Sequence, residues 1–475
     1  MNRSLAEALV SHHLRIIGGG HFLRNNKVSL FTNAVENDVQ EAMACVRRGC
    51  AVIAISPDGG FLSHIGVREL VCVETSLQLL FPGAFNALGY QLKTLHRYQT
   101  YAHPEGEAIV VSKENLAVWL WIPNGEGGFL IIGTDFAADL LRYRQGDPNK
   151  ATNRPTQSQW GIAGERPTYL FEDQLAGEDG SARHADQWAM ALGMTLSRKI
   201  GEPLADILPG GAPGAIVITG DDDQAYLEKY DEQLRVLDGT PITYLLHPLT
   251  RHTRKTLKAM QQVNPGIDFG IHPDALEAPG NYGKLFDEQV AWYRSLTDAP
   301  PLSLRNHGFL NDGYWGHLDA WIKHDVKISS NLPGLDGRVL NGSLLPARMS
   351  WRGELTNHWS ILTSMGDGVR FVSGMSDMDA ADRVWGIADG IRLSKFPGVM
   401  VLNLHPQNIA ETRAMHQVAK EIVRSGFVAW NLRQCWEWFT GIDRRTSREI
   451  EAERTGAVSR VWTALRRLTM DARTK

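Results

Sequence analysis

The stretch AIVITGDDDQAY, residues 215–226, decides the fold of the second half of the chain. It begins with apolar, partly β-branched residues, and such a run is typical of a buried strand. It ends in three consecutive aspartates, Asp221, Asp222 and Asp223. A carboxylate is costly to bury unless it is paired or bound to a metal ion. The stretch therefore predicts a buried strand with a functional end, or alternatively a helix cap formed by Asp223.

From this strand onward, strand-like and helix-like segments alternate along the chain. Helical patterns occupy residues 223–238, 254–264, 282–296 and 409–426. The strand-like segments are residues 215–223, 242–248, 267–274, 302–308, 326–331, 369–374, 399–406 and 426–434. Seven or eight β/α units in about 230 residues predict a barrel of the (β/α) type.

A different region precedes a cluster of Pro and Gly at residues 200–214, which predicts a domain boundary. Strand-like segments alternate there with helical ones, which predicts an α/β domain with a mostly parallel sheet. The strand-like segments are residues 28–33, 50–56, 116–123 and 127–135, and residues 34–49 read as an amphipathic helix. This layout is similar to the glutamine-amidotransferase-like flavodoxin-type fold. We expect no amidotransferase chemistry, because neither Cys45 nor Cys50 sits on a strand-to-helix elbow.

The expected organisation therefore has three parts: an α/β domain at 1–208, a barrel at 209–440 and a charged helical extension at 441–475. The extension could be a packing or oligomer arm, so a homo-oligomer is possible. The formal net charge of -4 argues against a general nucleic-acid or membrane-surface role. No run of 18 apolar residues and no signal-peptide pattern is present, which favours a cytoplasmic protein without a transmembrane segment.

Ionisable residues follow several of the strand-like segments after residue 214. In β/α barrels the active site forms at the C-terminal ends of the strands, so these side chains would converge. They are Asp221, Asp222, Asp223, His247, His272, Arg305, His307 and His405. Asp and His suit Zn²⁺ or a similar divalent ion. A single histidine at a strand end is more often structural, but five of about eight strands ending this way is hard to obtain from helix caps alone.

The residues from about 214 to 440 resemble the polysaccharide deacetylases of the NodB-homology type, also called carbohydrate esterase 4-like. The first family motif is T-F-D-D, and this chain has Thr219-Gly220-Asp221-Asp222. Some relatives use T-H-D-x-D, which would select Asp221 and Asp223. A regular strand places those two on the same side. The metal ligand is therefore Asp222 or Asp223.

The later family motifs are matched in order, with one departure. The second motif supplies His272 alone, because Leu276 stands where a second histidine could be. An R-x-H third motif is present as Arg305-Asn306-His307, so His307 could be the missing ligand. The last motif, L-x-H, resembles the segment ending in Leu404-His405.

The resemblance implies a distorted (β/α)7 barrel that holds a divalent metal, most plausibly Zn²⁺, and hydrolyses an N-acetyl group on a sugar or glycoconjugate. It implies Asp221 as general base, Arg305 as the residue that orients it and His405 as general acid. Tyr314 and Trp315 could stack on a sugar ring, although ordinary core or surface packing is the more common explanation for such residues. Two other functions stay open: an amidase acting on a small non-sugar amide, and a non-catalytic carbohydrate-binding or scaffold protein.

Overall fold

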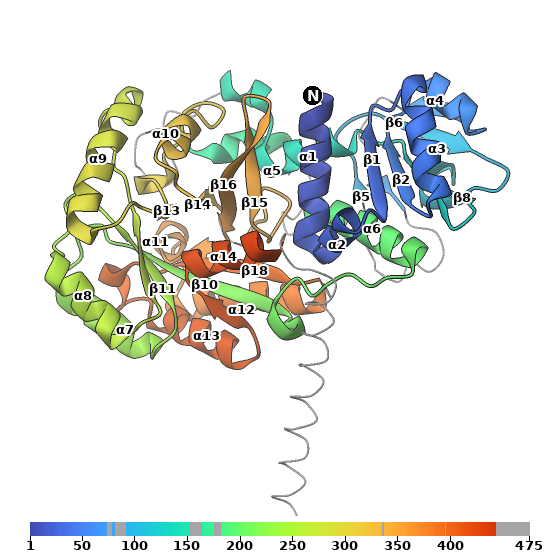
Figure 1. Ribbon diagram of the computed structural model, residues 1–475. Coiled ribbons are helices and arrows are strands. Elements are labelled where there is room, and N and C mark those ends of the chain that lie inside the picture. The colour runs from blue at the N-terminus through green and yellow to red at the C-terminus, as the bar shows by residue number, and fades with distance from the viewer. Residues whose placement is uncertain are drawn as a thin grey trace, which may run out of the picture.

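The computed structural model describes residues 1–73, 78–80, 92–152, 164–174, 182–334, 337–394 and 396–442 (Figure 1). The described chain forms a mixed α/β structure with two large sheets. One sheet belongs to the N-terminal part and the other to the part that follows Gly214. The expected extension at 441–475 lies outside the described residues, apart from the last two residues of a helix that ends at Ile442.

The N-terminal sheet is mixed, with strand order β1-β2-β9-β8-β6-β3 and β7 paired to β8. Its strands are β1 (Val28–Thr32), β2 (Ala51–Ile55), β3 (Arg68–Val73), β6 (Tyr98–Ala102), β7 (Glu107–Val111), β8 (Ala117–Asn124) and β9 (Gly127–Ile132). Only β1, β2 and β9 run parallel to one another, and the other pairs are antiparallel. The expectation of a mostly parallel sheet was wrong, and a flavodoxin-like domain is not confirmed. The reason is that the segment between β2 and β9 returns as antiparallel strands rather than as β/α units.

Helices cover both faces of this sheet. Strand β2 is buried along its whole length, and its side chains alternate between the two faces. Val52 packs in a cluster with α3 (Val39–Arg47) and α4 (Gly59–His64), whereas Ile53 packs in the cluster that contains α1 (Arg3–Leu14) and α6 (His184–Ile200). This two-sided burial explains why β2 reads as a continuous apolar run. The short helix α2 (Gly20–Arg24) and α5 (Phe136–Gln145) complete the layer on the α1 side.

The second sheet has the order β15-β16-β14-β13-β12-β11-β10-β18-β17, with β19 beside β10. Its strands are β10 (Gly214–Asp221), β11 (Ile242–Leu246), β12 (Ile267–Ile271), β13 (Ser303–Leu304), β14 (Ile328–Pro333), β15 (Ala347–Trp351), β16 (Glu354–Thr363), β17 (Met365–Gly366), β18 (Gly398–Asn403) and β19 (Val428–Trp430). All pairs are parallel except the β15–β16 hairpin. A further short pair, β4 (Gln78–Leu79) and β5 (Leu92–Lys93), stands apart.

The two ends of this sheet meet, so its parallel strands form a ring. Strand β16 pairs with β14, and β17, which follows it after one residue, pairs with β18. The connecting residue Ser364 donates its backbone N–H to the carbonyl of Val401 on β18 at 2.8 Å. Strand β18 in turn pairs with β10, the first strand of this sheet along the chain. The carboxyl ends of the ring strands therefore meet at one end of the ring.

Helices surround the ring on its outer side (Figure 1). They are α7 (Leu227–Leu237), α8 (Arg254–Val263), α9 (Tyr282–Thr297), α10 (Leu318–Lys323), α11 (Gly368–Ser373), α12 (Asp377–Leu393), α13 (Arg413–Arg424) and α14 (Leu432–Ile442). Their apolar faces bury residues such as Tyr230, Phe286 and Ile422. These helices hold the ring strands in place and so fix the positions of the strand ends.

One strand of the ring was assigned to the wrong segment by the sequence. Residues 369–374 were expected to be a strand, but they form helix α11 up to Ser373. Gly374 ends it in the left-handed conformation, with φ of 69°. The true strand is β16, whose outer half is exposed at the hairpin and therefore lacks a continuous apolar run. Short apolar runs do not distinguish a strand from a helix turn.

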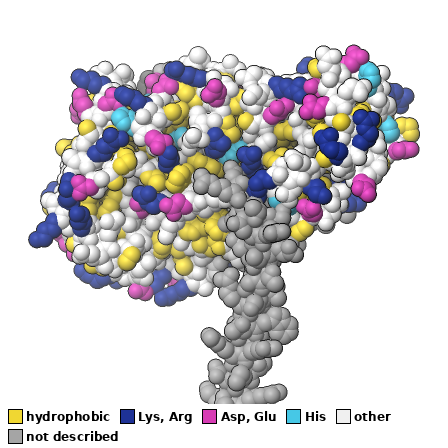
Figure 2. Space-filling view, in the orientation of Figure 1, with side chains coloured by type: hydrophobic (Ala, Val, Ile, Leu, Met, Phe, Trp, Pro, Cys, Tyr) yellow, Lys and Arg dark blue, Asp and Glu magenta, His cyan; other side chains and the backbone are white. Residues whose placement is uncertain are grey.

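Helix α1 joins the two parts of the molecule. His12 lies beside Trp359 of β16, with ring centroids 5.0 Å apart, and its Nε2 accepts the backbone N–H of Arg348 at 3.0 Å. Within the described residues, no helix has both the length and the apolar character needed to cross a bilayer. On the face drawn in Figure 2, acidic and basic side chains are interspersed rather than gathered by sign.

Candidate active site

The C-terminal end of β10 carries the three aspartates, and each has a different environment. Asp221 is the last residue of the strand and is 3% exposed. Gly220 precedes it at a position where a Cβ would lie 2.9 Å from the carbonyl oxygen of Leu404 and close to the ring of Tyr244. Only glycine lets the strand pass this close to its neighbours. The aspartates are therefore held directly against the adjoining loops.

Asp221 is held by two donors from other ring strands. Nη1 of Arg305 donates to Oδ1 of Asp221 at 2.7 Å, and Nδ2 of Asn403 donates to Oδ2 at 2.8 Å. Burial alone would raise the pKa of Asp221, but the charges of Arg305, His272 and His405 outweigh it and lower that pKa. Asp221 is therefore an oriented carboxylate that is ionised at neutral pH.

Arg305 is fully buried and uses every part of its guanidinium. Nε donates to the carbonyl of Ser330 at 3.1 Å, and Nη2 lies within 3.1 Å of the hydroxyls of Thr219, Ser330 and Thr363. These partners come from β10, β14 and β16. A guanidinium fixed on three strands cannot follow a moving carboxylate, so it sets the position of Asp221.

Asp222 points away from the other two carboxylates. It is completely buried, it accepts a hydrogen bond from the hydroxyl of Tyr230, and Oδ2 accepts the backbone N–H of His247 at 3.3 Å. These contacts connect β10 to α7 and to the end of β11. Asp222 was one of two candidate metal ligands from the sequence. Asp222 belongs to neither of the described groups whose ligand atoms lie close enough to hold an ion, so Asp223 is the candidate that the geometry favours.

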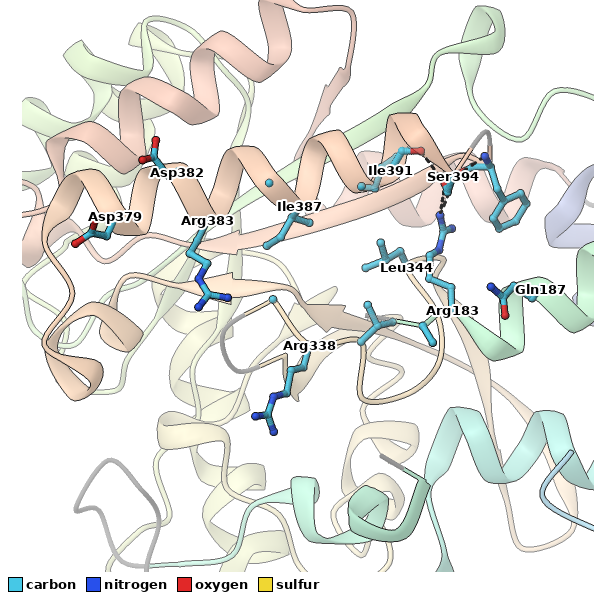
Figure 3. Close-up of a pocket in the computed structure, with 16 residues that line it drawn as sticks. Arg183, Gln187, Arg338, Leu344, Asp379, Asp382, Arg383, Ile387, Ile391 and Ser394 are labelled. Atoms are coloured by element: carbon cyan, nitrogen blue, oxygen red, sulfur yellow. Dashed lines mark hydrogen bonds between the residues drawn. The ribbon is translucent and has the colours of Figure 1, made fainter. Parts of the chain in front are cut away.

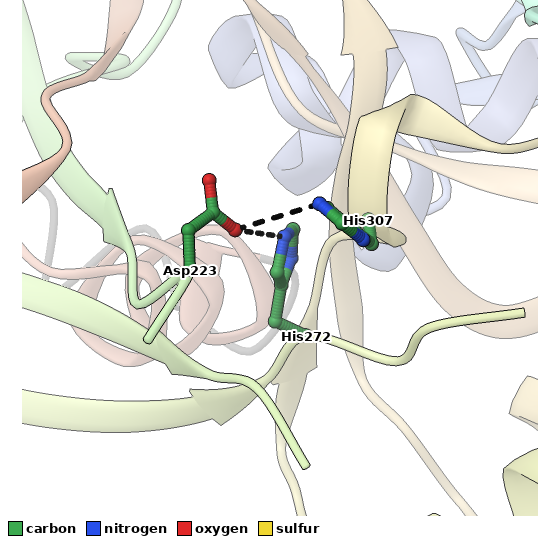
Figure 4. A group of neighbouring side chains, drawn as sticks. All are labelled: Asp223, His272 and His307. Atoms are coloured by element: carbon green, nitrogen blue, oxygen red, sulfur yellow. Dashed lines mark ion pairs between the residues drawn. The ribbon is translucent and has the colours of Figure 1, made fainter. Parts of the chain in front are cut away.

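Asp223 faces two histidines from neighbouring strand ends (Figure 4). Its backbone has a φ of +36°, which is unusual for a residue with a side chain and common at functional sites. Oδ1 of Asp223 lies 3.3 Å from Nε2 of His272 and 3.7 Å from Nε2 of His307. Burial opposes ionisation, but the close approach of His272 and the neighbouring His405 and His307 hold the pKa of Asp223 well below its usual range.

The three side chains fit a divalent metal ion. Among the described residues, Oδ1 of Asp223 and Nε2 of His272 are buried without a hydrogen-bond partner. Nδ1 of His272 lies 2.7 Å from the carbonyl oxygen of Arg305, so it carries the proton and leaves a lone pair on Nε2. Ligands bonded to Zn²⁺ at tetrahedral angles lie about 3.4 Å apart, close to the distances found here. One carboxylate and two imidazoles are a donor set that Zn²⁺ accepts.

His405 lies opposite the histidine pair and faces both Asp221 and Asp223. Its Nε2 is 3.6 Å from Oδ2 of Asp221 and 3.5 Å from Oδ2 of Asp223. Its Nδ1 is bound by Oδ1 of Asp367, and its backbone N–H donates to Oδ2 of the same residue at 2.8 Å. Burial favours neutral imidazole, but the carboxylates of Asp367, Asp223 and Asp221 outweigh it and raise the pKa of His405 to about 10.

These side chains line a cavity of about 200 Å³ at the C-terminal end of the ring. The polar lining is formed by Asp221, Asp223, His272, His307, Asn403 and His405. Phe309, Pro333 and Val369 supply apolar surface, and at four glycines the wall is formed by the backbone. The cavity thus places a carboxylate, an imidazolium and a candidate metal site around one small volume.

Two residues expected at the site do not line this cavity. Trp315 is 2% exposed, and its Nε1 donates to the carbonyl of Gln145 at 2.8 Å, so it packs against the N-terminal part. Its neighbour Tyr314 packs against the apolar core of the barrel part. The burial of Trp315 corrects its expected stacking on a sugar, whereas the stacking of the partly buried Tyr314 stays a prediction.

A larger cavity of about 770 Å³ lies elsewhere, along helix α12 (Figure 3). Arg338 and Arg383 point into it in Figure 3, and Arg183 borders it. The guanidinium of Arg183 is already bound by Asp186 and by the carbonyls of Phe396 and Pro397. Among its described lining residues, none belongs to the smaller cavity. The grouped reactive side chains thus lie in the smaller cavity.

Two site residues were missed by the sequence reasoning. Asn403 was not selected, although its position at the end of β18 is the same signal that selected the histidines. Asp367 follows the two-residue strand β17, and no strand was expected there. If β16 and β17 had been recognised as one edge of the ring, Asp367 would have stood out as the acid that follows them.

Comparisons with known proteins find solved structures that match about half of the chain at low sequence identity. No profile of a protein family matches, and no curated protein matches in sequence. Solved structures that match include a probable polysaccharide deacetylase from Pseudomonas aeruginosa (TM-score 0.40, 11% identity, 51% of this chain and 96% of that one). They also include peptidoglycan deacetylase PdaC from Bacillus subtilis (0.32, 12%, 49% and 94%) and a family 4 carbohydrate esterase from Streptomyces lividans in complex with acetate (0.31, 11%, 46% and 92%).

Proposed function

We propose that this chain is a metal-dependent hydrolase that removes an N-acetyl group from a sugar or glycoconjugate. One observation carries the proposal. Asp223, His272 and His307 bring three ligand atoms within 4.8 Å of one another, and the ionised Asp221 and the protonated His405 border the same cavity. A base, an acid and a metal site around one small volume are what the hydrolysis of an amide requires. The motif resemblance described from the sequence supports the sugar amide as substrate.

Asp223, His272 and His307 would hold the metal, with Zn²⁺ as the favoured ion. When bound, the ion would polarise the acyl carbonyl and lower the pKa of a water molecule. Asp221 then takes a proton from the attacking water through the oxygen that faces the cavity. Arg305 and Asn403 keep that carboxylate ionised and in place. The tetrahedral oxyanion needs donors close by, and such electrostatic stabilisation is usually the largest contribution to catalysis.

The leaving amine must gain a proton, and His405 is placed to supply it. Its Nδ1 is bound by Asp367, so the proton available to the cavity is on Nε2. The raised pKa of about 10 keeps this ring protonated at neutral pH. Asp221 and His405 therefore start the reaction in the forms that a base and an acid need.

The cavity volume supports a small acyl group. Sites that enclose a whole small-molecule ligand measure about 300–1,000 Å³, whereas this cavity measures about 200 Å³. Only the acyl-amide end of a substrate fits among Phe309, Pro333 and Val369. The rest of the substrate would lie outside the mouth, so the cavity selects the acyl group more strongly than the group that carries it.

The test is release of acetate from N-acetylated sugars, nucleotide sugars and small non-sugar amides by protein loaded with Zn²⁺. We expect the protein to hydrolyse the sugars. This activity should be lost on chelation and restored by Zn²⁺. Turnover confined to non-sugar amides would favour an amidase on the same barrel. If the loaded protein binds an ion but hydrolyses no member of the panel, the N-deacetylase proposal is wrong. The cytoplasmic location, the homo-oligomer and the division at residue 208 stay predictions.

A further inference from the structure

A second group of side chains lies directly behind His307. Oδ2 of Asp274 is 3.3 Å from Nδ1 of His307 and 3.2 Å from Nε2 of His247. These three residues also have ligand atoms close enough to hold an ion of their own. We propose instead that Asp274 and His247 are positioning residues that turn Nε2 of His307 toward Asp223 and His272. This inference rests on the proposed metal site.

The hydrogen bonds of His247 decide between the two interpretations. The backbone N–H of Leu249 donates to Nδ1 of His247 at 3.1 Å, so Nδ1 holds a lone pair. The proton of the neutral ring is then on Nε2, and it points at Oδ2 of Asp274. A metal ion at Nε2 would need the opposite tautomer, whose Nδ1 proton would face the N–H of Leu249. His247 is therefore a donor to Asp274 and not a metal ligand.

Asp274 is fixed on its other sides, so it can orient a ring. Its Oδ1 accepts the backbone N–H of Leu276 at 3.1 Å. Its backbone N–H donates to Oε1 of Gln289 at 2.9 Å, and its carbonyl accepts Nε2 of Gln289 at 2.6 Å. The remaining oxygen, Oδ2, meets the two histidines. Helix α9, which carries Gln289, thereby fixes the carboxylate relative to β11 and β12.

The consequence for His307 follows from its two ring nitrogens. Oδ2 of Asp274 lies 3.3 Å from Nδ1 of His307 without a hydrogen bond of good geometry, and the charge of the carboxylate favours a proton on Nδ1, which leaves the lone pair on Nε2 toward Asp223. His307 is 26% exposed and begins a short 3-10 helix (His307–Phe309), unlike the buried His272, whose Nδ1 is held by a backbone carbonyl. Asp274 thus provides the acceptor near Nδ1 of His307, as the carbonyl of Arg305 does for Nδ1 of His272.

The test measures binding of Zn²⁺ and of Co²⁺ to the chelator-stripped full chain, by competition with a chromophoric chelator and by the visible spectrum of bound Co²⁺. Asp274→Asn is expected to weaken binding about 10- to 100-fold, the range found when such outer partners of a ligating histidine are removed. It should also change the Co²⁺ spectrum, because His307 is no longer held in one orientation. Asp287→Asn is the matched control. Oδ1 of Asp287 lies 2.6 Å from Nε2 of His324, and neither residue lines the cavity.

A second pair of variants tests His247 without removing a carboxylate. His247→Leu removes the donor to Asp274, whereas His247→Gln keeps an N–H that can reach it. We expect weaker metal binding in the first and partial rescue in the second. Wild-type affinity in both Asp274→Asn and His247→Leu would overturn the inference while leaving the metal site intact, and two ions per wild-type chain would overturn it as well. A wild-type chain that binds no ion would overturn the proposed metal site, and the inference with it.

Discussion

Arg305 and Asp221 form a fully buried ion pair, 2.7 Å from Nη1 to Oδ1, between residues 84 positions apart in the sequence. Burying both charges costs desolvation energy that offsets much of their attraction, so the pair is weak evidence for a purely stabilising role. Its geometry leaves Oδ2 of Asp221 bound to Asn403 and facing His405. We interpret the pair as a device that keeps a buried carboxylate ionised at the cavity.

Replacing Asp221 with Asn should abolish most turnover and leave metal content largely unchanged. The amide cannot accept a proton from water, and loss of a general base costs about 10²- to 10⁴-fold in rate. The variant should also unfold more easily, because Arg305 loses its buried counter-charge, which costs about 3–5 kcal/mol. Steady-state kinetics, metal analysis and chemical denaturation measure the three effects. Asp319→Asn, which breaks an exposed pair with Arg352, is the control and should change none of them.

The alkaline limb of the rate profile should report His405. The ring must be protonated to serve as an acid, and its pKa is raised to about 10, so activity should fall as pH rises through that value. Asp367→Asn removes the carboxylate on Nδ1 and should move the limb toward lower pH, with a smaller effect on KM than on kcat. A limb that stays in place in this variant would contradict the assigned role of Asp367.

The stability of the metal-free chain should fall with pH for the same reason. The folded-state pKa of His405, about 10, lies above its ordinary value of 6.5, so folding retains a proton that the unfolded chain loses. The contribution is complete below pH 6.5 and is lost as pH rises toward about 10. Denaturant titrations at several pH values in the presence of chelator check this slope, and Asp367→Asn should flatten it.

Much of the site was predictable because parallel strands share one edge for their carboxyl ends. Asp221, His272, His307 and His405 were selected from strand ends far apart in the sequence, and the structure brings them to one cavity. Arg305, selected in the same way, lies behind the cavity and binds Asp221. Their roles stay predictions. The argument worked where a strand was short and buried along its whole length, as β10, β11 and β12 are.

The rest depended on tertiary contacts that no local pattern encodes. Asp367 was missed because β16 is half exposed and was not recognised, while helix α11 was mistaken for the strand. Trp315 was a candidate for stacking on a sugar, but its Nε1 donates to the carbonyl of Gln145 in the N-terminal part. The sequence could not place that part relative to the barrel.

Replacing His272 with Ala should remove the metal. The change deletes a ligand whose Nε2 is buried and unpartnered within the described residues, so binding should weaken beyond detection by metal analysis of the purified protein. The matched control is His358→Ala. His358 is equally buried, but its ring contacts the carbonyl of Val326 and the hydroxyl of Ser329. That variant should lose stability and keep its metal, and equal metal loss in both would indicate a general effect of unfolding.

Asp222 and Asp223 are adjacent, so replacing each with Asn separates structure from metal binding. Asp222→Asn should lower the free energy of unfolding by about 1–3 kcal/mol, because the hydroxyl of Tyr230 and the N–H of His247 lose a charged acceptor. Metal binding should be little changed. Asp223→Asn should weaken metal binding strongly and change stability less, since its carboxylate faces the cavity. Chelator competition and denaturation on both variants give the answer, and the opposite pattern would assign the metal to Asp222.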